Sequence, residues 1–360
     1  MHGFNKKELL ELAWEKPIWA QLEITNRCNQ DCIFCFASYK EKQKEPGLTL
    51  KQWKIIVNKL RNLGIKRLDF SGRESFMSPY FFDLVKWCSK EGLEININTN
   101  GTFNPTKILP YVNELVFSIH GIKEIHDRIA GYKGSFKLIE ENFKRATQFG
   151  AKATINMFLV KSNYHQIMEL FEYFNSKYNV HRFSPALPIP SRLGSAFDDQ
   201  TINMTQELLQ DYIHILKQIP EEKLLLKHGF QSIFINEPDH YKDRDSLLLP
   251  NCAGGKYKLI VEADGGVFPC SFFKSDDWYC GNILTDNEYK IWKNGKGFLP
   301  FRQLITKNEV PTKCNSCYKK PRCFSGCRAW TKSYQEGGFN NDEDLRCDLG
   351  NARIGSRNNN

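Results

Sequence analysis

The amino-acid sequence predicts an α/β protein with a cysteine-rich C-terminal domain. Strand-like and helical segments alternate over roughly the first two hundred residues, which favours a parallel sheet with helices outside it. The chain has 360 residues, enough for two domains, and 41% of them are apolar, enough for a real core. Eight of its twelve cysteines lie beyond residue 250.

The alternation is read from hydrophobic periodicity. Six strand-like runs occupy residues 21–25, 67–70, 94–98, 116–119, 153–160 and 182–187, and four helical patterns occupy 49–63, 79–91, 135–149 and 164–178. Six strands are too few for a closed eight-stranded barrel. The first helix should begin at Thr49 as N-cap and bury Trp53, Ile56, Val57 and Leu60. On the second helix, Cys88 falls on the apolar face and is predicted to be a core thiol.

Composition and cysteine usage exclude several classes of protein. No apolar run reaches the roughly 18 residues that a membrane span needs, and the charged N-terminus is not a secretory signal, so we predict a cytoplasmic protein without membrane contact. Without such a signal, twelve cysteines favour metal or catalytic use over disulfides. The formal charge of +9 is scattered along the chain. Nucleic-acid binding therefore has no specific support.

Three cysteines near the N-terminus form the most informative motif. Cys28, Cys32 and Cys35 stand in CNQDCIFC, directly after the first strand-like run, and Phe34 precedes the third cysteine. An iron–sulfur cluster is normally held by four thiolates, so three leave one iron open. Zinc prefers four ligands, usually in CxxC pairs, and this spacing fits that alternative poorly.

This motif resembles that of radical SAM enzymes. The resemblance implies a partial (β/α)6 TIM-like barrel whose [4Fe–4S] cluster binds S-adenosylmethionine through its amine and carboxylate, with Phe34 against the adenine. Reductive cleavage of that cofactor would give a 5′-deoxyadenosyl radical, which abstracts hydrogen from a substrate. The electron would come from a flavodoxin or ferredoxin. As in closed barrels, the chemistry should lie at the C-terminal ends of the strands.

The resemblance assigns further cofactor contacts to strand ends. SGRES, residues 71–75, stands where the family has its amine-binding motif; Gly72 and Glu74 match, whereas Arg73 and Ser75 depart from it. At the position of Arg73, the family's glycine would supply a positive φ that arginine disfavours. On its own, SGRES also reads as an ordinary turn between strand and helix.

The resemblance implies three further cofactor contacts. Ser118 resembles the family's ribose-binding residue. Asn98 is a weaker candidate, because Asn and Gly also mark turns. Arg128 would reach the cofactor carboxylate, although a surface arginine is an equal alternative.

Two residues are candidate acid–base groups. His120 follows a predicted strand, where it would act as acid or base or serve as a hydrogen-bonded turn residue, the second being favoured. Asp264 would be a base or, more simply, would shape the turn in EADGG. Ser271 stands where the sulfatase-maturing branch has an aspartate base, and serine is a poor base. Sulfatase maturation is therefore disfavoured.

The C-terminal cysteines match the SPASM pattern at every position. The pattern consists of Cys252, Gly265, Cys270, Cys314, Cys317, Cys323, Cys327 and Cys347. A pair of zinc ribbons is the alternative, and the N-terminal triplet disfavours it.

The family's interleaved ligation implies two auxiliary clusters, expected to be [4Fe–4S]. The outer cluster would be held by Cys314, Cys317, Cys323 and Cys347, and the inner one by Cys252, Cys270 and Cys327. Cys280, expected across a hairpin from Cys270, would complete the inner cluster or be a packed thiol that leaves an open site; ligation is slightly favoured.

The pattern as a whole predicts a radical SAM maturase that forms a thioether or carbon–carbon cross-link in a ribosomally made precursor peptide. Alternatives are a radical SAM dehydrogenase or decarboxylase of an aminocyclitol or tetrapyrrole, and a non-catalytic iron–sulfur carrier. Only 27 residues precede Cys28, so leader recognition would need a separate protein or an exposed strand edge. The expected parts are a barrel over 1–205, a helical linker over 206–245, the SPASM domain over 246–350 and a disordered tail over 351–360.

Overall fold

The fold is built around one eight-stranded sheet in which the six predicted strands lie in chain order. The computed structural model describes residues 15–35, 47–187, 206–225, 252–306, 310–316, 323 and 326–329. Strands β1 to β6 are all parallel and pair in the order β6-β5-β4-β3-β2-β1. Their bounds are Trp19–Leu22, Arg67–Phe70, Glu94–Thr99, Glu114–Ser118, Lys152–Phe158 and Arg182–Ala186. Because β6 and β8 are the sheet edges, the barrel stays open.

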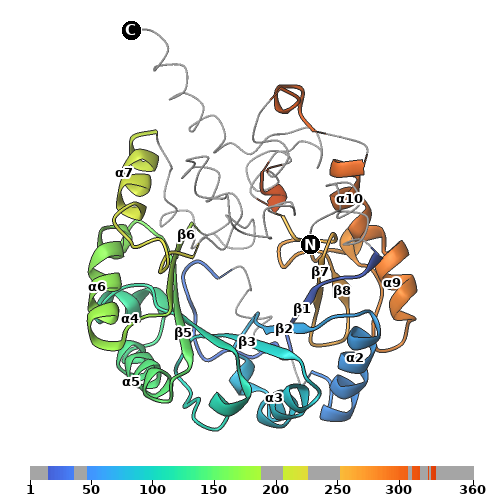
Figure 1. Cartoon of the computed structure of the whole chain (residues 1–360), viewed down its shortest axis with the longest axis horizontal. Coiled ribbons are helices and arrows are strands. Elements are labelled where there is room, and N and C mark those ends of the chain that lie inside the picture. Colours follow the sequence, from blue (N-terminus) through green and yellow to red (C-terminus); the bar gives the residue numbers. More distant parts are fainter. Residues whose placement is uncertain are drawn as a thin grey trace.

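Helices cover the outer face of this curved sheet, as Figure 1 shows. They are α2 (Leu50–Asn62), α3 (Phe81–Lys90), α4 (Glu124–Ala130), α5 (Ser135–Gln148), α6 (Ile167–Tyr178) and α7 (Gln206–Leu216). Each crossover returns the chain to the same end of the sheet. All parallel strands therefore end at one edge, called here the barrel mouth. The predicted α/β partial barrel is confirmed.

The periodicity placed the four predicted helices, which are α2, α3, α5 and α6, within three residues of their observed ends. Thr49 is the N-cap of α2, and its hydroxyl and the Gln52 side chain form a capping box. The predicted apolar face of α2 is fully buried. Cys88 on α3 is also fully buried, and burial raises the pKa of its thiol to about 12. It is a core thiol, as predicted.

The sheet extends beyond the six predicted strands. Strand β7 (Lys258–Val261) pairs parallel with β1, and β8 (Val267–Phe268) pairs antiparallel with β7. The C-terminal cysteine-rich segment thus begins inside the barrel sheet rather than beside it. Sequence analysis did not foresee this, because a pairing between residues so far apart in the chain leaves no local periodicity.

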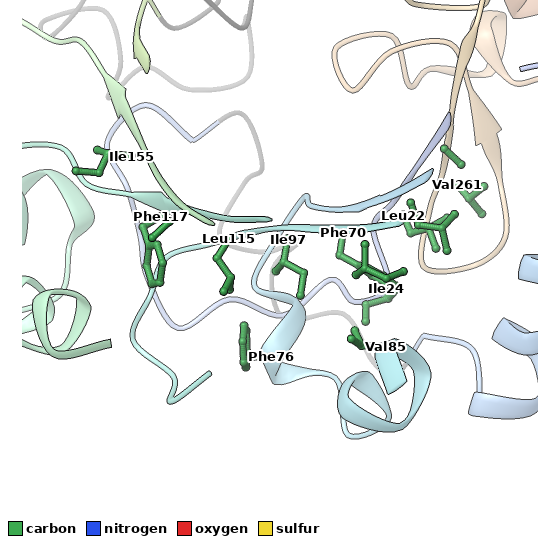
Figure 2. Close-up of a cluster of buried hydrophobic side chains, with 14 of the residues drawn as sticks. Leu22, Ile24, Phe70, Phe76, Val85, Ile97, Leu115, Phe117, Ile155 and Val261 are labelled. Atoms are coloured by element: carbon green, nitrogen blue, oxygen red, sulfur yellow. The ribbon is translucent and has the colours of Figure 1, made fainter. Parts of the chain in front are cut away.

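Side chains alternate between the two faces of the sheet. Apolar residues point outward and form the core under the helices, among them Leu22, Phe70, Ile97, Leu115 and Phe117, as Figure 2 shows. Intervening residues point into the barrel and are largely polar. The strands therefore present a polar interior below the mouth.

Residues 284–289 of the C-terminal region pack beside α2. This region contains α9 (Glu288–Asn294), α10 (Leu299–Thr306) and short 3-10 turns. Lys59 of α2 donates to the carbonyls of Leu284 and Asp286, and Tyr289 of α9 donates to the Asn62 carbonyl. Among the described residues, no helix has the length and apolar character needed to span a membrane.

Candidate active site

The predicted cluster cysteines lie on the loop that leaves β1 at the barrel mouth. The backbone amide of Cys35 donates to the Cys32 carbonyl at 3.0 Å, which curls the second half of the motif. Asn100, at the end of β3, places its Nδ2 4.0 Å from Cys28 Sγ and 2.7 Å from Asn29 Oδ1. All three thiols are partly exposed. The loop therefore presents three thiols at the mouth.

Helix α4 holds the other side of the cysteine loop. The amides of Asp31 and Ile33 donate to the carbonyls of Ala130 and Ile129 at 3.1 and 3.0 Å. Gly131, which follows α4, has φ +63°, and a Cβ there would come within 2.6 Å of the Asp31 carbonyl oxygen. This close approach requires glycine. Sequence analysis missed α4, a seven-residue helix too short to give a periodic signal.

The SGRES segment lies beside the cysteine loop, as expected for a cofactor motif. Glu74 is buried and accepts hydrogen bonds from the amides of Phe76 and Asn100 and from the Thr99 hydroxyl. Burial raises the pKa of Glu74 to about 7, although these three donors oppose the shift. The Glu74 amide donates to the Arg27 carbonyl at 3.1 Å. Glu74 thus links the ends of β2 and β3 to the start of the cysteine loop.

A buried ion cluster joins β1, the SGRES segment and the C-terminal domain. Glu23, 3% exposed, accepts from Lys274 Nζ at 2.7 Å, Arg73 Nη1 at 3.4 Å and the Ser271 hydroxyl at 3.3 Å. Lys274 also pairs with Glu262 at 2.5 Å. Burial raises the pKa of Glu23, but Lys274 and Arg73 outweigh it and hold that pKa below its usual value.

Gly72 leaves room for this cluster. Its φ is +102°, and an added Cβ would lie 2.7 Å from Glu23 Cγ. The glycine is therefore required both by its backbone conformation and by the approach of Glu23. Arg73, which stands where the family has glycine, is used as an ion-pair partner of Glu23 instead.

Phe34 of the cysteine loop belongs to an aromatic cluster. The Phe34 ring lies 4.6 Å from His120 and 5.0 Å from Phe158 between centroids. His120 is 1% exposed, its Nδ1 accepts from the Phe158 amide, and its carbonyl accepts from Asn163. Burial lowers the pKa of His120 well below its usual value. These contacts favour the hydrogen-bonded turn residue over an acid–base group.

Polar side chains line the barrel interior below the mouth. Ser118, Asn156 and Ser184 are aligned across β4, β5 and β6 by the strand register. Asn156 Oδ1 and Ser184 Oγ are buried without a hydrogen-bond partner in the described part of the chain. Asn98 of β3 is partly buried and pairs with Val116, two residues before Ser118 on β4. Unpaired buried acceptors are typical of a site that a polar ligand completes.

Two further candidates lie at exposed positions. Arg128 is exposed on α4, the helix that holds the cysteine loop. Asp264 is exposed at the turn between β7 and β8, where its carboxylate accepts from the Gly266 amide at 2.8 Å. Gly265 adopts φ +89° in the same turn. The contacts of Asp264 are those of the turn-forming residue considered in the sequence analysis.

The thiols expected to hold the inner auxiliary cluster lie near one another, and all three are partly exposed. The thiol of Cys270 lies within electrostatic range of Cys252 and Cys327, and its pKa is raised to about 12, mainly by burial. For the outer cluster, Cys314 is buried and Cys323 partly buried, whereas Cys317 and Cys347 lie outside the described residues.

Cys280 has the contacts of a packed thiol. Its amide pairs with the Val267 carbonyl, not across from Cys270, because the chain between the two cysteines forms a tight turn at Cys270–Phe273 and a 3-10 turn. Its Sγ lies 3.4 Å from the Trp278 carbonyl and would lie 2.9 Å from a Cβ on Gly297. These contacts favour an inner cluster with three thiolates.

The donor sets fit iron–sulfur clusters. Among the described residues, no three Cys, His, Asp or Glu side chains are gathered into a closed metal-binding geometry. The fit therefore rests on chemistry and placement. Three thiols stand on one loop at the mouth, and three more, partly exposed, lie near the buried side chains of Lys256 and Arg328. Thiolates are the ligands that iron–sulfur clusters use.

Sequence analysis missed several residues that build this site. Glu23 and Lys274 were not singled out, and neither were Asn156 and Ser184. A signal existed for Glu23, because an acidic residue within a buried strand run needs a partner. The others are defined by strand register and by contacts between distant segments.

An open barrel with three thiols on the loop after its first strand, followed by a second thiol-rich domain, is the arrangement of one class of enzyme. The comparisons agree. The radical SAM superfamily model matches residues 22–174, and the model of the SPASM iron-sulfur cluster-binding domain matches residues 252–318. The chain belongs to the SPASM-type radical SAM enzymes.

Similar proteins cover most of the chain at low identity. The AdoMet-dependent heme synthase of Methanosarcina barkeri is 25% identical over 90% of this chain and 94% of its own. The PqqA peptide cyclase of Bradyrhizobium diazoefficiens is 25% identical over 87% and 81%. The mycofactocin maturase MftC of Mycobacterium tuberculosis is 24% identical over 89% and 81%. The crystal structure of Streptococcus suis SuiB bound to S-adenosylmethionine shares the fold, with TM-score 0.72 and 18% identity over 92% and 77%.

Proposed function

We propose that this enzyme modifies a ribosomally made precursor peptide, forming a thioether or a carbon–carbon cross-link. Two of the relatives described above are named as a peptide cyclase and a maturase, and they match along most of their length. The same SPASM-type architecture is present here.

The observation that carries the proposal is the contact between the cofactor side and the C-terminal domain. The Glu23 carboxylate pairs with Arg73 of the SGRES segment. It also accepts a hydrogen bond from the hydroxyl of Ser271, the residue that follows Cys270. The proposed inner-cluster loop is thereby tied to the strand that leads into the cysteine triplet. A substrate radical formed at the mouth would lie near a second iron–sulfur group that can take up its electron.

Within this proposal, the chain's own residues bind and orient the reactants. When bound, the open-iron cluster and S-adenosylmethionine supply a 5′-deoxyadenosyl radical for hydrogen abstraction. Phe34 would lie against the adenine, Ser118 beside the ribose and Glu74 near the amine. Below the mouth, Asn156 Oδ1 and Ser184 Oγ would accept hydrogen bonds from the bound ligands.

We also propose that the enzyme works with two auxiliary clusters, an electron donor and a leader-binding protein. The two auxiliary clusters would be ligated as the family pattern implies, the inner by three thiolates. A flavodoxin or ferredoxin would supply electrons. Residues 223–225 pair with β6 at Phe183, so that part of the β6 edge is already occupied, which favours a separate recognition protein.

The test is an anaerobic assay of the reconstituted enzyme with a candidate precursor peptide. We expect 5′-deoxyadenosine to form and the peptide to lose two hydrogens for each cross-link, as measured by mass spectrometry. A Cys28→Ala variant should form neither product. Cofactor cleavage without any change in peptide mass, across precursors encoded beside this gene, would contradict the peptide proposal.

Oxidation or decarboxylation of a tetrapyrrole is the second candidate. It is favoured by the heme synthase relative, which matches 94% of its own length. Adding a propionate-bearing tetrapyrrole to the same assay distinguishes the two. Release of carbon dioxide with 5′-deoxyadenosine would favour this alternative over the peptide.

A further inference from the structure

Exposed cations are concentrated on the helix that holds the cysteine loop. In residues 120–140, the exposed charged side chains are four cations, Lys123, Arg128, Lys133 and Lys137, and one acid, Glu124. Within the described residues, none of these four cations forms an ion pair. The positive charge of this segment is therefore available to a partner.

Asp127 of α4 does not neutralise these cations. It is half-buried, and its carboxylate accepts from two backbone amides and one hydroxyl at residues 134–136. Asp127 thereby stabilises the start of α5. The exposed acids of this segment and of the cysteine loop are Glu124 and Asp31, so exposed cations outnumber exposed acids.

The cations lie beside the backbone that carries the cluster thiols. The amides on either side of Cys32 donate to the last two carbonyls of α4, at 3.1 and 3.0 Å. Gly131, which follows α4, closely approaches the Asp31 carbonyl, and Tyr132 and Lys133 come next in the chain. A protein bound at Tyr132 and Lys133 would be separated from Cys32 by little more than one layer of hydrogen-bonded backbone.

Two features of this segment do not serve stability. Lys123 precedes α4 with φ +48°, a conformation that is costly for a non-glycine residue, and its side chain does not cap the helix. Tyr132 is 37% exposed, and within the described residues its side chain makes no hydrogen bond or aromatic contact. Strained backbone is found at binding sites, and tyrosine is enriched in protein interfaces. Both features favour a binding role for this segment.

We propose that Lys123, Arg128, Tyr132 and Lys133, called here the α4 surface, dock an acidic electron-transfer protein that reduces the open-iron cluster. One electron passes from the reduced carrier to the cluster, so the carrier is oxidised by one electron and no bond forms or breaks. Complementary charge speeds such encounters, and electron-transfer complexes bury small interfaces. This inference rests on the electron donor of the proposed function but not on the identity of the substrate.

An electron carrier fits the α4 surface better than the peptide substrate does. A substrate has to enter the mouth, where Phe34 lies against His120 and Phe158. An electron has to reach only the cluster, and α4 contacts the cysteine loop through backbone hydrogen bonds on both sides of Cys32. The carrier can therefore act from outside the barrel, without occupying the space of the substrate.

The experiment measures cluster reduction and binding without a precursor peptide. The full chain is reconstituted anaerobically, and its reduction by a purified acidic flavodoxin, and separately by an acidic ferredoxin, is followed by stopped-flow absorbance at several salt concentrations. Calorimetry measures the affinity for the oxidised carriers. The surface variant combines Lys123→Glu with Lys133→Glu. Arg128 is left unchanged because the sequence predicts that it contacts the cofactor.

The control makes the same change of charge far from the mouth. It combines Lys144→Glu with Lys152→Glu, two exposed positions near the end of α5 and at the start of β5. Because the strands end at the mouth, the start of β5 lies at the opposite edge of the sheet. The two double variants therefore differ in the place of the new charges and not in their number.

At low salt, we expect the acidic carrier to reduce the surface variant about tenfold more slowly than the parent, with the control within about twofold. Affinity should fall in parallel, and both differences should shrink as salt screens the charges. Dithionite, which needs no docking site, should reduce all three proteins alike. Equal rates in the surface variant and the parent, or equal losses in the surface variant and the control, would overturn the inference.

The remaining outcomes are also decisive. Should the surface variant lose iron, Lys133→Gln replaces it and should be reduced about threefold more slowly than the parent; an unchanged rate overturns the inference. Unchanged reduction with weaker binding of a precursor peptide, or with loss of a dimer, would assign the surface to another occupant. A parent that dithionite reduces and neither carrier reduces would overturn the docking site. Failure to modify any peptide would contradict the proposed substrate and leave this result intact.

Discussion

The Glu23 carboxylate lies 2.7 Å from Lys274 Nζ, although the two residues are 251 positions apart in the chain. Glu23 stands at the end of β1, and Lys274 follows Cys270 by four residues. Arg73 reaches the same carboxylate from the SGRES segment. A single buried carboxylate therefore fixes the cofactor motif and the proposed inner-cluster loop to the strand that precedes the cysteine triplet.

Replacement of Glu23 by Gln should destabilise the fold strongly. The change takes the Glu23 carboxylate away from Arg73 and from Lys274, which keeps its second partner Glu262, and breaking a buried ion pair costs about 3–5 kcal/mol. Urea unfolding measures the loss. Glu91→Gln is the matched control, because Glu91 pairs with Arg61 at a partly exposed site, where a pair is worth at most about 1 kcal/mol. Equal losses in the two variants would contradict the role given to Glu23.

The same carboxylate predicts an acid-sensitive stability. Because the pKa of Glu23 is lower in the folded state than its ordinary value of 4.5, its contribution is fully present above that value and is lost as the pH falls below it. Thermal unfolding should show a steeper acid loss for the wild type than for Glu23→Gln. Parallel profiles over that range would be evidence against a paired carboxylate.

Replacement of Gly72 by Ala should cost more than the same change at Gly92. Both glycines have positive φ, +102° and +79°, so each variant carries a backbone cost of about 1–2 kcal/mol. Only at Gly72 would the new methyl group meet Glu23, since nothing lies within 4 Å at Gly92. Overpacking adds about 1–3 kcal/mol. Thermal unfolding and titration with S-adenosylmethionine measure the difference, which should vanish if Glu23 moves aside freely.

The strands and helices of the barrel were predictable because each has its own hydrophobic period. The predicted 67–70 strand coincides with β2, and the α2 cap and buried face follow from Thr49 and its apolar spacing. The site was predictable only where a motif carries it, as in the cysteine triplet and SGRES. Contacts made by Glu23 with Lys274, and the pairing of β7 with β1, depend on chain closure over long distances. Hydrophobic periodicity reports local structure, so it does not predict these contacts.

The pKa of Glu74 predicts how cofactor binding changes with pH. Burial raises this pKa to about 7, so the group is partly protonated at neutral pH. The N–H groups of the cofactor amine would donate to Glu74, which favours the ionised carboxylate form. The affinity for S-adenosylmethionine should therefore fall as the pH drops below about 7, approaching tenfold per pH unit.

Calorimetry of cofactor binding between about pH 6 and pH 8 tests the Glu74 prediction. The Glu74→Gln variant keeps an oxygen that can accept from Thr99 and Asn100 but has no proton to lose in this range. Its affinity should be weaker at pH 8 and should lack the decline seen in the wild type. If the two proteins share one pH profile, the decline arises from the cofactor and not from Glu74.

Iron content decides between the two roles of Cys280. Its amide pairs with Val267 and its thiol packs beside Trp278 and Gly297, so Cys280→Ala should keep the iron of the parent. Loss of the buried sulfur should cost only about 1–2 kcal/mol of stability. Cys270→Ala, the matched change at an expected ligand, should lose the iron of the inner cluster. Anaerobic iron and sulfide analysis with electron paramagnetic resonance compares them, and an equal iron deficit in both variants would make Cys280 the fourth ligand.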